Sequence, residues 1–124
     1  MKLEHGKSAK MHDKLLKDAL SLSMELNKRI NKMEDLELKE KITNSSLAML
    51  SNISNYFELT YVGEEIEKNE NNDLRKLVLV AKDACIDLRY RLNIVRNTGY
   101  LDLIDVKNFI KISTEISNEL ETLL

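Results

Sequence analysis

Few side chains in this sequence could act as nucleophiles or metal ligands, and they are widely separated. The 124 residues include one cysteine, Cys85, and two histidines, His5 and His12. Neither histidine has a cysteine or an acidic residue at a spacing that binds zinc. Cys85 falls on the apolar side of a predicted helix, with no histidine positioned to activate it, so we expect a buried and unreactive thiol. The Glu-x-x-His motif of di-iron bundles and the glycine-rich phosphate loop are both absent from the sequence. The sequence therefore predicts no enzyme, and no metal, cofactor or small-molecule substrate.

A row of basic side chains offers a different chemistry, the binding of an anion. Arg75, Lys82, Arg89 and Arg96 recur every seven residues along one flank of a predicted helix over residues 72–101. They would lie about 10.5 Å apart along the axis and drift by about 20° per step, so they form a linear track. Arginine binds phosphate through two hydrogen bonds, so the track predicts an anionic partner, with RNA as the first candidate. The alternative is that these residues pair with acids of the second helix or of another copy of the chain.

The same helix carries apolar residues on the side that faces away from the expected core. They are Leu79, Ile86, Tyr90 and, slightly displaced, Ile94. A monomeric bundle would leave these side chains in water, and an exposed apolar patch usually marks a contact with another protein. We therefore expect self-association through this face, with a closed homo-oligomeric ring as the favoured form.

The helix that positions both rows, residues 72–101, is the longest uninterrupted helical pattern in the chain. Its core side follows the 3.6-residue period of an amphipathic helix. The expected core residues are Leu74, Leu77, Val78, Ala81, Ala84, Cys85, Leu88, Leu92 and Val95. Gly99 follows as a residue that can adopt the left-handed conformation at a helix end.

Three further segments show the same kind of period. Residues 10–33, about 38–62 and 102–124 are predicted helices, and Asp102 can cap the last of them. Their expected core consists of Leu15, Ala19, Leu22, Leu26, Ile30 and Met33 in the first, Leu38, Ile42, Met49, Ile53, Tyr56 and Phe57 in the second, and Val106, Phe109, Ile112, Ile116, Leu120 and Leu123 in the last. The sequence therefore predicts an all-α fold, an antiparallel up-down-up-down four-helix bundle over residues 10–124, with a flexible N-terminal lead-in over residues 1–9.

Two polar segments interrupt this pattern. Residues 43–55 of the second helix are rich in serine and asparagine, which are only moderate helix formers. Such small side chains would let a neighbouring helix approach closely, or their hydroxyls and amides could form a polar patch for a ligand. Residues 64–72 are predicted to be a mobile acidic connection, with Asn72 or Asp73 as the cap of the third helix.

Composition bounds the location of the protein. The chain has 19 basic and 21 acidic residues, a net charge of −2, and its basic and acidic segments alternate. It has a single cysteine, no signal peptide and no apolar run approaching the roughly 18 residues of a membrane span. These features predict a cytoplasmic protein that does not contact a membrane.

Two stretches resemble a known superfamily. Residues 79–92, LVAKDACIDLRYRL, and residues 97–101, NTGYL, resemble the third helix and following turn of a four-helix-bundle superfamily. That superfamily holds the ribosomal-RNA intervening-sequence proteins and the accessory variability determinants of diversity-generating retroelements. The resemblance would extend over residues 11–124.

The second helix separates the two branches. Residues 52–54, Asn-Ile-Ser, resemble the Asn-Ile-Ala part of the intervening-sequence signature. Asn55-Tyr56 stands where that group usually has Glu-Gly, and the paired arginines that usually precede the signature are missing. These departures, with the pattern Leu88-Arg89-x-x-Leu92, favour the retroelement branch.

The resemblance implies a non-catalytic accessory protein. Proteins of the retroelement branch form a pentameric ring, bind the reverse transcriptase and its template-repeat RNA, and support mutagenic cDNA synthesis. They are commonly strongly basic, whereas this chain carries a net charge of −2, which limits RNA binding to the basic edges of the first and third helices. The alternative is a protein-interaction module, similar to the intervening-sequence proteins, with no nucleic-acid role.

Overall fold

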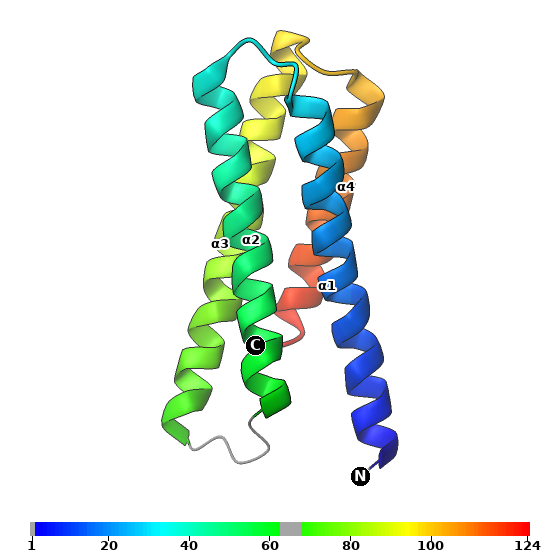
Figure 1. The fold of residues 1–124 in the computed structure, drawn as a ribbon, viewed down its shortest axis with the longest axis vertical. Helices are drawn as coiled ribbons and strands as arrows, with labels where there is room; N and C mark the ends of the chain where they lie inside the picture. The colour runs from blue at the N-terminus through cyan, green and yellow to red at the C-terminus, as the bar shows by residue number, and fades with distance from the viewer. Residues whose placement is uncertain (1, 63–67) are drawn as a thin grey trace.

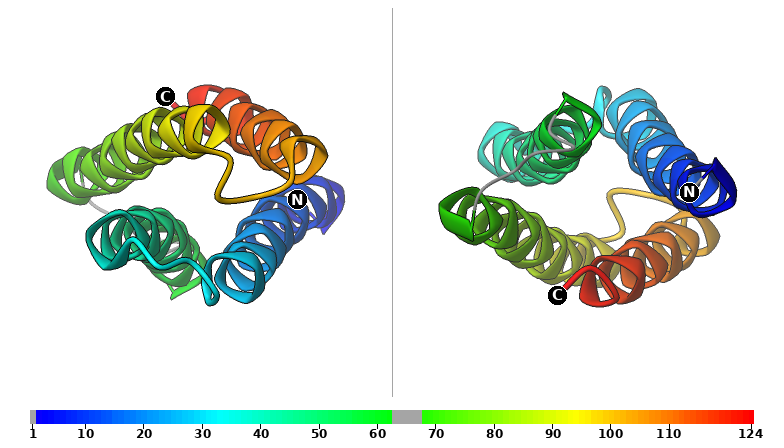
Figure 2. Two further views of the ribbon diagram at one scale, coloured as in Figure 1. Left: turned by 90° about the horizontal axis from the view of Figure 1, so that it is seen from above. Right: turned by 90° about the horizontal axis from the view of Figure 1, so that it is seen from below.

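The computed structural model describes the backbone of residues 2–62 and 68–124 and the side chains of residues 14–60 and 73–124. These residues form four helices and no strand: α1 (Lys2–Ile30), α2 (Leu36–Val62), α3 (Lys68–Thr98) and α4 (Leu103–Glu121). The helices lie side by side as in a four-helix bundle (Figure 1). Each packs against its neighbours in sequence, and α1 also packs against α4, so α3 lies diagonally across from α1 (Figure 2). The all-α prediction is confirmed.

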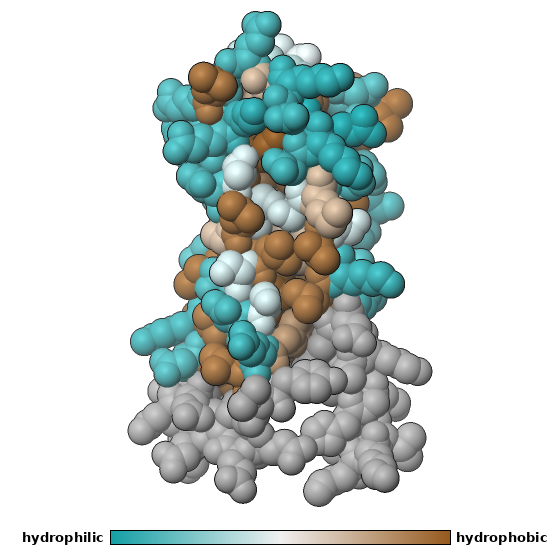
Figure 3. Space-filling view, viewed as in Figure 1, coloured by the Kyte–Doolittle hydropathy of each residue, from teal (hydrophilic) through white to brown (hydrophobic). Residues whose placement is uncertain are grey.

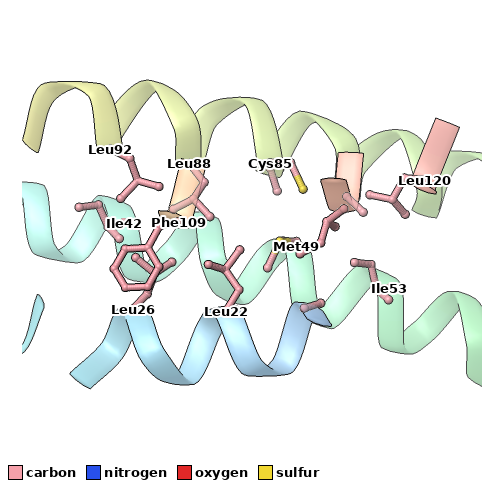
Figure 4. Packing of buried hydrophobic residues seen from close by; sticks show 14 of the residues in the cluster. Leu22, Leu26, Ile42, Met49, Ile53, Cys85, Leu88, Leu92, Phe109 and Leu120 are labelled. Carbon is pink, nitrogen blue, oxygen red and sulfur yellow. The ribbon is translucent and has the colours of Figure 1, made fainter. Parts of the chain in front are cut away.

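One apolar face of each helix contributes to a common core. All six core residues expected in the first helix, from Leu15 to Met33, are buried. Figure 4 shows Leu26 of α1, Ile42 of α2 and Leu92 of α3 directed into this core. Five expected core residues are only half-buried: Tyr56, Leu74, Leu77, Ile112 and Leu123.

The unequal lengths of α3 and α4 explain part of this difference. α3 has 31 residues and α4 has 19. Lys82 of α3 pairs with Glu121, the last residue of α4, so the part of α3 before Lys82 extends past the end of α4 (Figure 1). Leu74 and Leu77 lie in that part, where α4 does not cover them.

Local capping sets three of the helix ends. The backbone N–H of Leu38 donates to Asp35 Oδ1 at 3.0 Å, at the start of α2. Gly99 adopts a positive φ of 76° and its N–H donates to the Val95 carbonyl at 3.1 Å, which closes α3. Asp102 accepts from the N–H of Ile104 at 2.8 Å and caps α4. The predicted roles of Gly99 and Asp102 are confirmed.

Two predicted boundaries are wrong. α1 begins at Lys2, so the helix includes residues 2–9 of the expected lead-in. α3 begins at Lys68, so Asn72 and Asp73 lie inside the helix and do not cap it. Both extensions contain few apolar residues and hence no periodic signal, but they contain no proline, so a helix anchored by its core residues can continue through them. Residues 64–67 of the expected acidic connection lie outside the described residues.

Candidate interaction surfaces

The two middle residues of the predicted basic track contact another helix of the same chain. The Lys82 ammonium pairs with the Glu121 carboxylate of α4. The Arg89 guanidinium donates from Nη1 to the carbonyl oxygen of Ser113, also in α4, at 3.2 Å. The alternative prediction was that the basic residues pair with acids of the second helix or of another copy of the chain. In the structure, the partners of Lys82 and Arg89 both lie on α4.

The two outer residues of the track are exposed and could contact a partner. Arg75 and Arg96 are exposed, and neither forms an ion pair with a side chain that the structure describes. They stand 21 residues apart on one helix, about 31 Å at 1.5 Å per residue. The continuous track is therefore divided into two separate cationic positions.

The residue of α4 that accepts from Arg89 is small and buried. Ser113 is fully buried, and its hydroxyl donates to the Cys85 carbonyl of α3 at 3.3 Å. A short side chain here lets α3 and α4 approach closely, so the guanidinium can reach a backbone oxygen of the opposite helix. Sequence reasoning missed Ser113 and the buried Ser117, although both share a side of the helix with Phe109, Ile116 and Leu120.

Two serines of α2, Ser45 and Ser46, are packing residues whose hydroxyls form hydrogen bonds. Ser46 and Ser23 of α1 share a hydrogen bond of 2.7 Å. Ser45 donates to the Asp87 carboxylate of α3, which also lies 3.6 Å from the Arg91 guanidinium. Both serines are buried. Of the two interpretations of this polar stretch, close helix approach is the one that the geometry supports.

The outward face of α3 is apolar, as its sequence predicts. Leu79, Ile86 and Tyr90 are 40%, 52% and 59% exposed, and together they are called the α3 stripe below. The Arg91 guanidinium lies 5.1 Å from the centre of the Tyr90 ring, a favourable cation–π contact. Ile94 was the fourth residue predicted for this face, but it is half-buried against the core and not exposed. The reason is its displaced position around the helix.

A second apolar surface, which sequence reasoning missed, lies between α1 and α2. Leu20 and Met24 of α1 and Leu47 of α2 are exposed at the edges of a depression of about 210 Å³. We call this depression the α1–α2 groove; Figure 3 shows its apolar residues in the middle of the face. The available signal was the pair Leu20 and Met24, four residues apart and outside the core seam.

The depression between α1 and α4 is larger, about 320 Å³, but charges of both signs line it. Arg29 lies 3.6 Å from Asp105 there. At its edge Lys14 donates to Glu119 at 3.1 Å, and this hydrogen bond raises the pKa of Lys14. Four acidic and two basic residues line this depression, so acidic charge is in excess there.

Cys85 is a protonated thiol at neutral pH. Its burial in the core raises its pKa from 9.0 to about 11, although the charge of Arg89 and the hydroxyl of Ser113 act in the opposite direction. Since only the thiolate is a good nucleophile, the geometry gives Cys85 a packing role.

We expect the alkylation rate of Cys85 in the folded protein to stay low until the pH approaches 11, and the unfolded chain to react from about pH 9. The unfolded state releases the thiol proton first as the pH rises, so the folded state loses stability between these two values. Iodoacetamide labelling followed by mass spectrometry, with and without denaturant, measures the rates. A Cys85→Ala, Asn55→Cys variant, with the thiol at an exposed position of α2, is the control. Fast labelling of native Cys85 at pH 8 would contradict the prediction.

Within the described residues, no group of three or more His, Cys, Asp or Glu side chains is arranged to hold a metal ion. None of the helices, over its described part, combines the length and apolarity that crossing a bilayer requires.

The fold and these surfaces define an all-α protein with four helices in the described residues. The chain matches no known protein family, no curated protein and no solved structure.

Proposed function

We propose that this protein is a non-catalytic accessory protein of a diversity-generating retroelement, which binds the reverse transcriptase and its template RNA and supports mutagenic cDNA synthesis in the cytoplasm. The observation that carries the proposal is that α3 presents an exposed apolar stripe together with two exposed arginines, Arg75 and Arg96, which form no ion pair with a described side chain. The resemblance of residues 79–92 and 97–101 to the accessory proteins supplies the particular partners. The stripe would mediate self-association into a ring, with five members as the resemblance implies.

Within this proposal, the outer arginines are the candidates for the nucleic-acid contact. Lys82 and Arg89 contact α4, so changing them would disturb packing as well as charge. Substitution of Arg75 or Arg96 breaks no ion pair to a described side chain, so it changes the charge without disturbing the packing of α3 on α4. An exposed guanidinium can bind a phosphate oxygen pair, and each such contact steepens the slope of log K against log salt concentration, by about 0.7 for a single strand and about 0.9 for a B-form duplex.

We expect the double variant Arg75→Glu, Arg96→Glu to keep its fold and oligomeric state and to bind template RNA more weakly in the presence of the reverse transcriptase. The slope of log K against log salt should fall by about one unit for each lost phosphate contact. Fluorescence anisotropy of labelled RNA over a salt series measures both effects.

The control for this experiment is Lys107→Glu, Lys111→Glu, which makes an equal change of charge at exposed positions on α4. It should leave the affinity closer to that of the wild type. If both double variants bind RNA equally well, the two outer arginines are not phosphate contacts, and the nucleic-acid part of the proposal fails.

The second candidate function is a protein-interaction module with no nucleic-acid role. The engagement of Lys82 and Arg89 by α4 favours it, because half of the basic track already has partners inside the chain. For this function the wild-type protein would show no salt-sensitive RNA binding, while self-association or binding to a protein partner would persist.

A further inference from the structure

A network of contacts joins a buried residue of α2 to the exposed α3 stripe. Ser45 of α2 is buried, and its hydroxyl donates to Asp87 Oδ2 of α3. The other carboxylate oxygen of Asp87 lies 3.6 Å from Arg91 Nη2. The Arg91 guanidinium in turn lies 5.1 Å from the centre of the Tyr90 ring. These four residues, called the Ser45 network below, therefore connect the interface between α2 and α3 with the outward face of α3.

The buried end of the network restricts the exposed end. The Asp87 side chain is 48% exposed, and on its own it would form only a weak ion pair with an arginine one turn away. The Ser45 hydroxyl holds one oxygen of this carboxylate, so the second oxygen faces Arg91 in a fixed orientation. The Nε atom of Arg91 is also buried. The Tyr90 ring is 59% exposed, yet it lies against a neighbour that is held in place.

An ordered tyrosine on an exposed face favours association. Tyrosine and arginine are among the residues that contribute most to the affinity of protein contacts. A side chain that is already ordered before binding loses less conformational entropy when the contact forms. Tyr90 and Arg91 meet both conditions at one end of the α3 stripe.

We infer that Ser45 and Asp87 are positioning residues, which act through Arg91 to hold the Tyr90 ring ready for self-association through the α3 stripe. Ser45 is only 5% exposed, so its influence on a second copy of the chain passes through the network. The inference rests on the self-association in the proposed function and adds the residues that set its affinity. It does not depend on RNA or on the number of copies in the assembly.

Removal of the hydroxyl in Ser45→Ala should weaken self-association by about two- to fivefold, which is the value of one cation–π contact at an exposed site. The matched control is Ser46→Ala. Ser46 is 4% exposed, on the same helix, and its hydroxyl shares a hydrogen bond with Ser23 of α1. This control should keep the wild-type affinity. Sedimentation equilibrium measures the dissociation constants.

A double-mutant cycle distinguishes positioning of Tyr90 from a general loosening of the helices. If Ser45 acts through the Tyr90 ring, Ser45→Ala should weaken self-association of the wild type and have no further effect in a Tyr90→Ala background. A purely structural role of Ser45 would give the same loss in both backgrounds. That result would contradict the inference.

Asp87→Asn tests the network at an exposed position, where a substitution is well tolerated. It keeps an oxygen that can accept from Ser45 and removes the charge that pairs with Arg91. We expect the same loss of about two- to fivefold. Asp83→Asn makes an equal change of charge at another exposed position of α3 and should have a smaller effect. Circular dichroism checks that every variant is folded.

A measurement on single chains tests the network without assembly. Because Arg91 Nε is buried, its hydrogen should exchange slowly with water in the wild type. Nuclear magnetic resonance of the arginine Nε–H signals should show faster exchange in Ser45→Ala and an unchanged rate in Ser46→Ala. An unchanged rate in Ser45→Ala would show that the network does not hold Arg91, and the inference would be wrong whatever the oligomeric state.

The outcomes also separate this inference from the proposed function. If the wild type is monomeric, or if Tyr90→Ala and Ile86→Asp leave its assembly unchanged, the α3 stripe is not a contact, and both the proposed self-association and the inference fail. If these two variants weaken assembly while Ser45→Ala behaves like Ser46→Ala, self-association through α3 stands and the inference alone is wrong.

Discussion

Replacing Leu88 by alanine is expected to lower the free energy of unfolding by about 2–5 kcal/mol. Leu88 lies in the middle of α3, is fully buried, and projects into the shared core (Figure 4). The substitution removes apolar contacts and leaves a cavity that a bundle packed from several directions cannot readily close. Urea unfolding followed by circular dichroism at 222 nm measures the change.

The matched control for this prediction is Leu79→Ala on the same helix. It removes the same atoms from a position that is 40% exposed in the single chain. The expected loss within one chain is below about 1 kcal/mol, since this side chain is already partly exposed to water and its removal leaves no enclosed cavity. Equal losses at Leu88 and Leu79 would show that the two faces of α3 are not distinguished as the structure describes.

The second large effect is expected from Ser113→Leu, which should destabilise the protein by about 1–3 kcal/mol or more. Ser113 is fully buried where α3 and α4 approach each other, and a leucine would force the two helices apart. The separation should also break the hydrogen bond from Arg89 to the Ser113 carbonyl, so the charge of Arg89 would turn to solvent. Thermal and urea unfolding measure the loss.

Two neighbouring substitutions separate volume from hydrogen bonding at this position. Ser113→Ala removes only the hydroxyl that donates to Cys85, and should cost about 0.5–1.5 kcal/mol. Thr114→Leu adds an apolar side chain at the adjacent exposed position and should have little effect. If Ser113→Leu is as stable as the wild type, α3 and α4 are not held closely at this point.

The helix ends could be predicted where the signal is local. Gly99 and Asp102 act within a few residues of their own positions, so their residue types are enough to indicate an end and a start. The start of α3 carried no such signal, because the helix continues through the polar residues 68–72. Packing further along the helix can stabilise this extension.

The sequence by itself determined the all-α class, the core face of each helix and the exposed α3 stripe. These follow from the period of apolar residues, which is a property of each segment alone. Tertiary structure decided which surfaces stay free. It engages Lys82 and Arg89 with α4, leaves Arg75 and Arg96 unpaired among the described side chains, and forms the α1–α2 groove. The physical reason is that these features depend on which helices are neighbours and how far each extends along the bundle, and the periodicity of a single helix contains neither quantity.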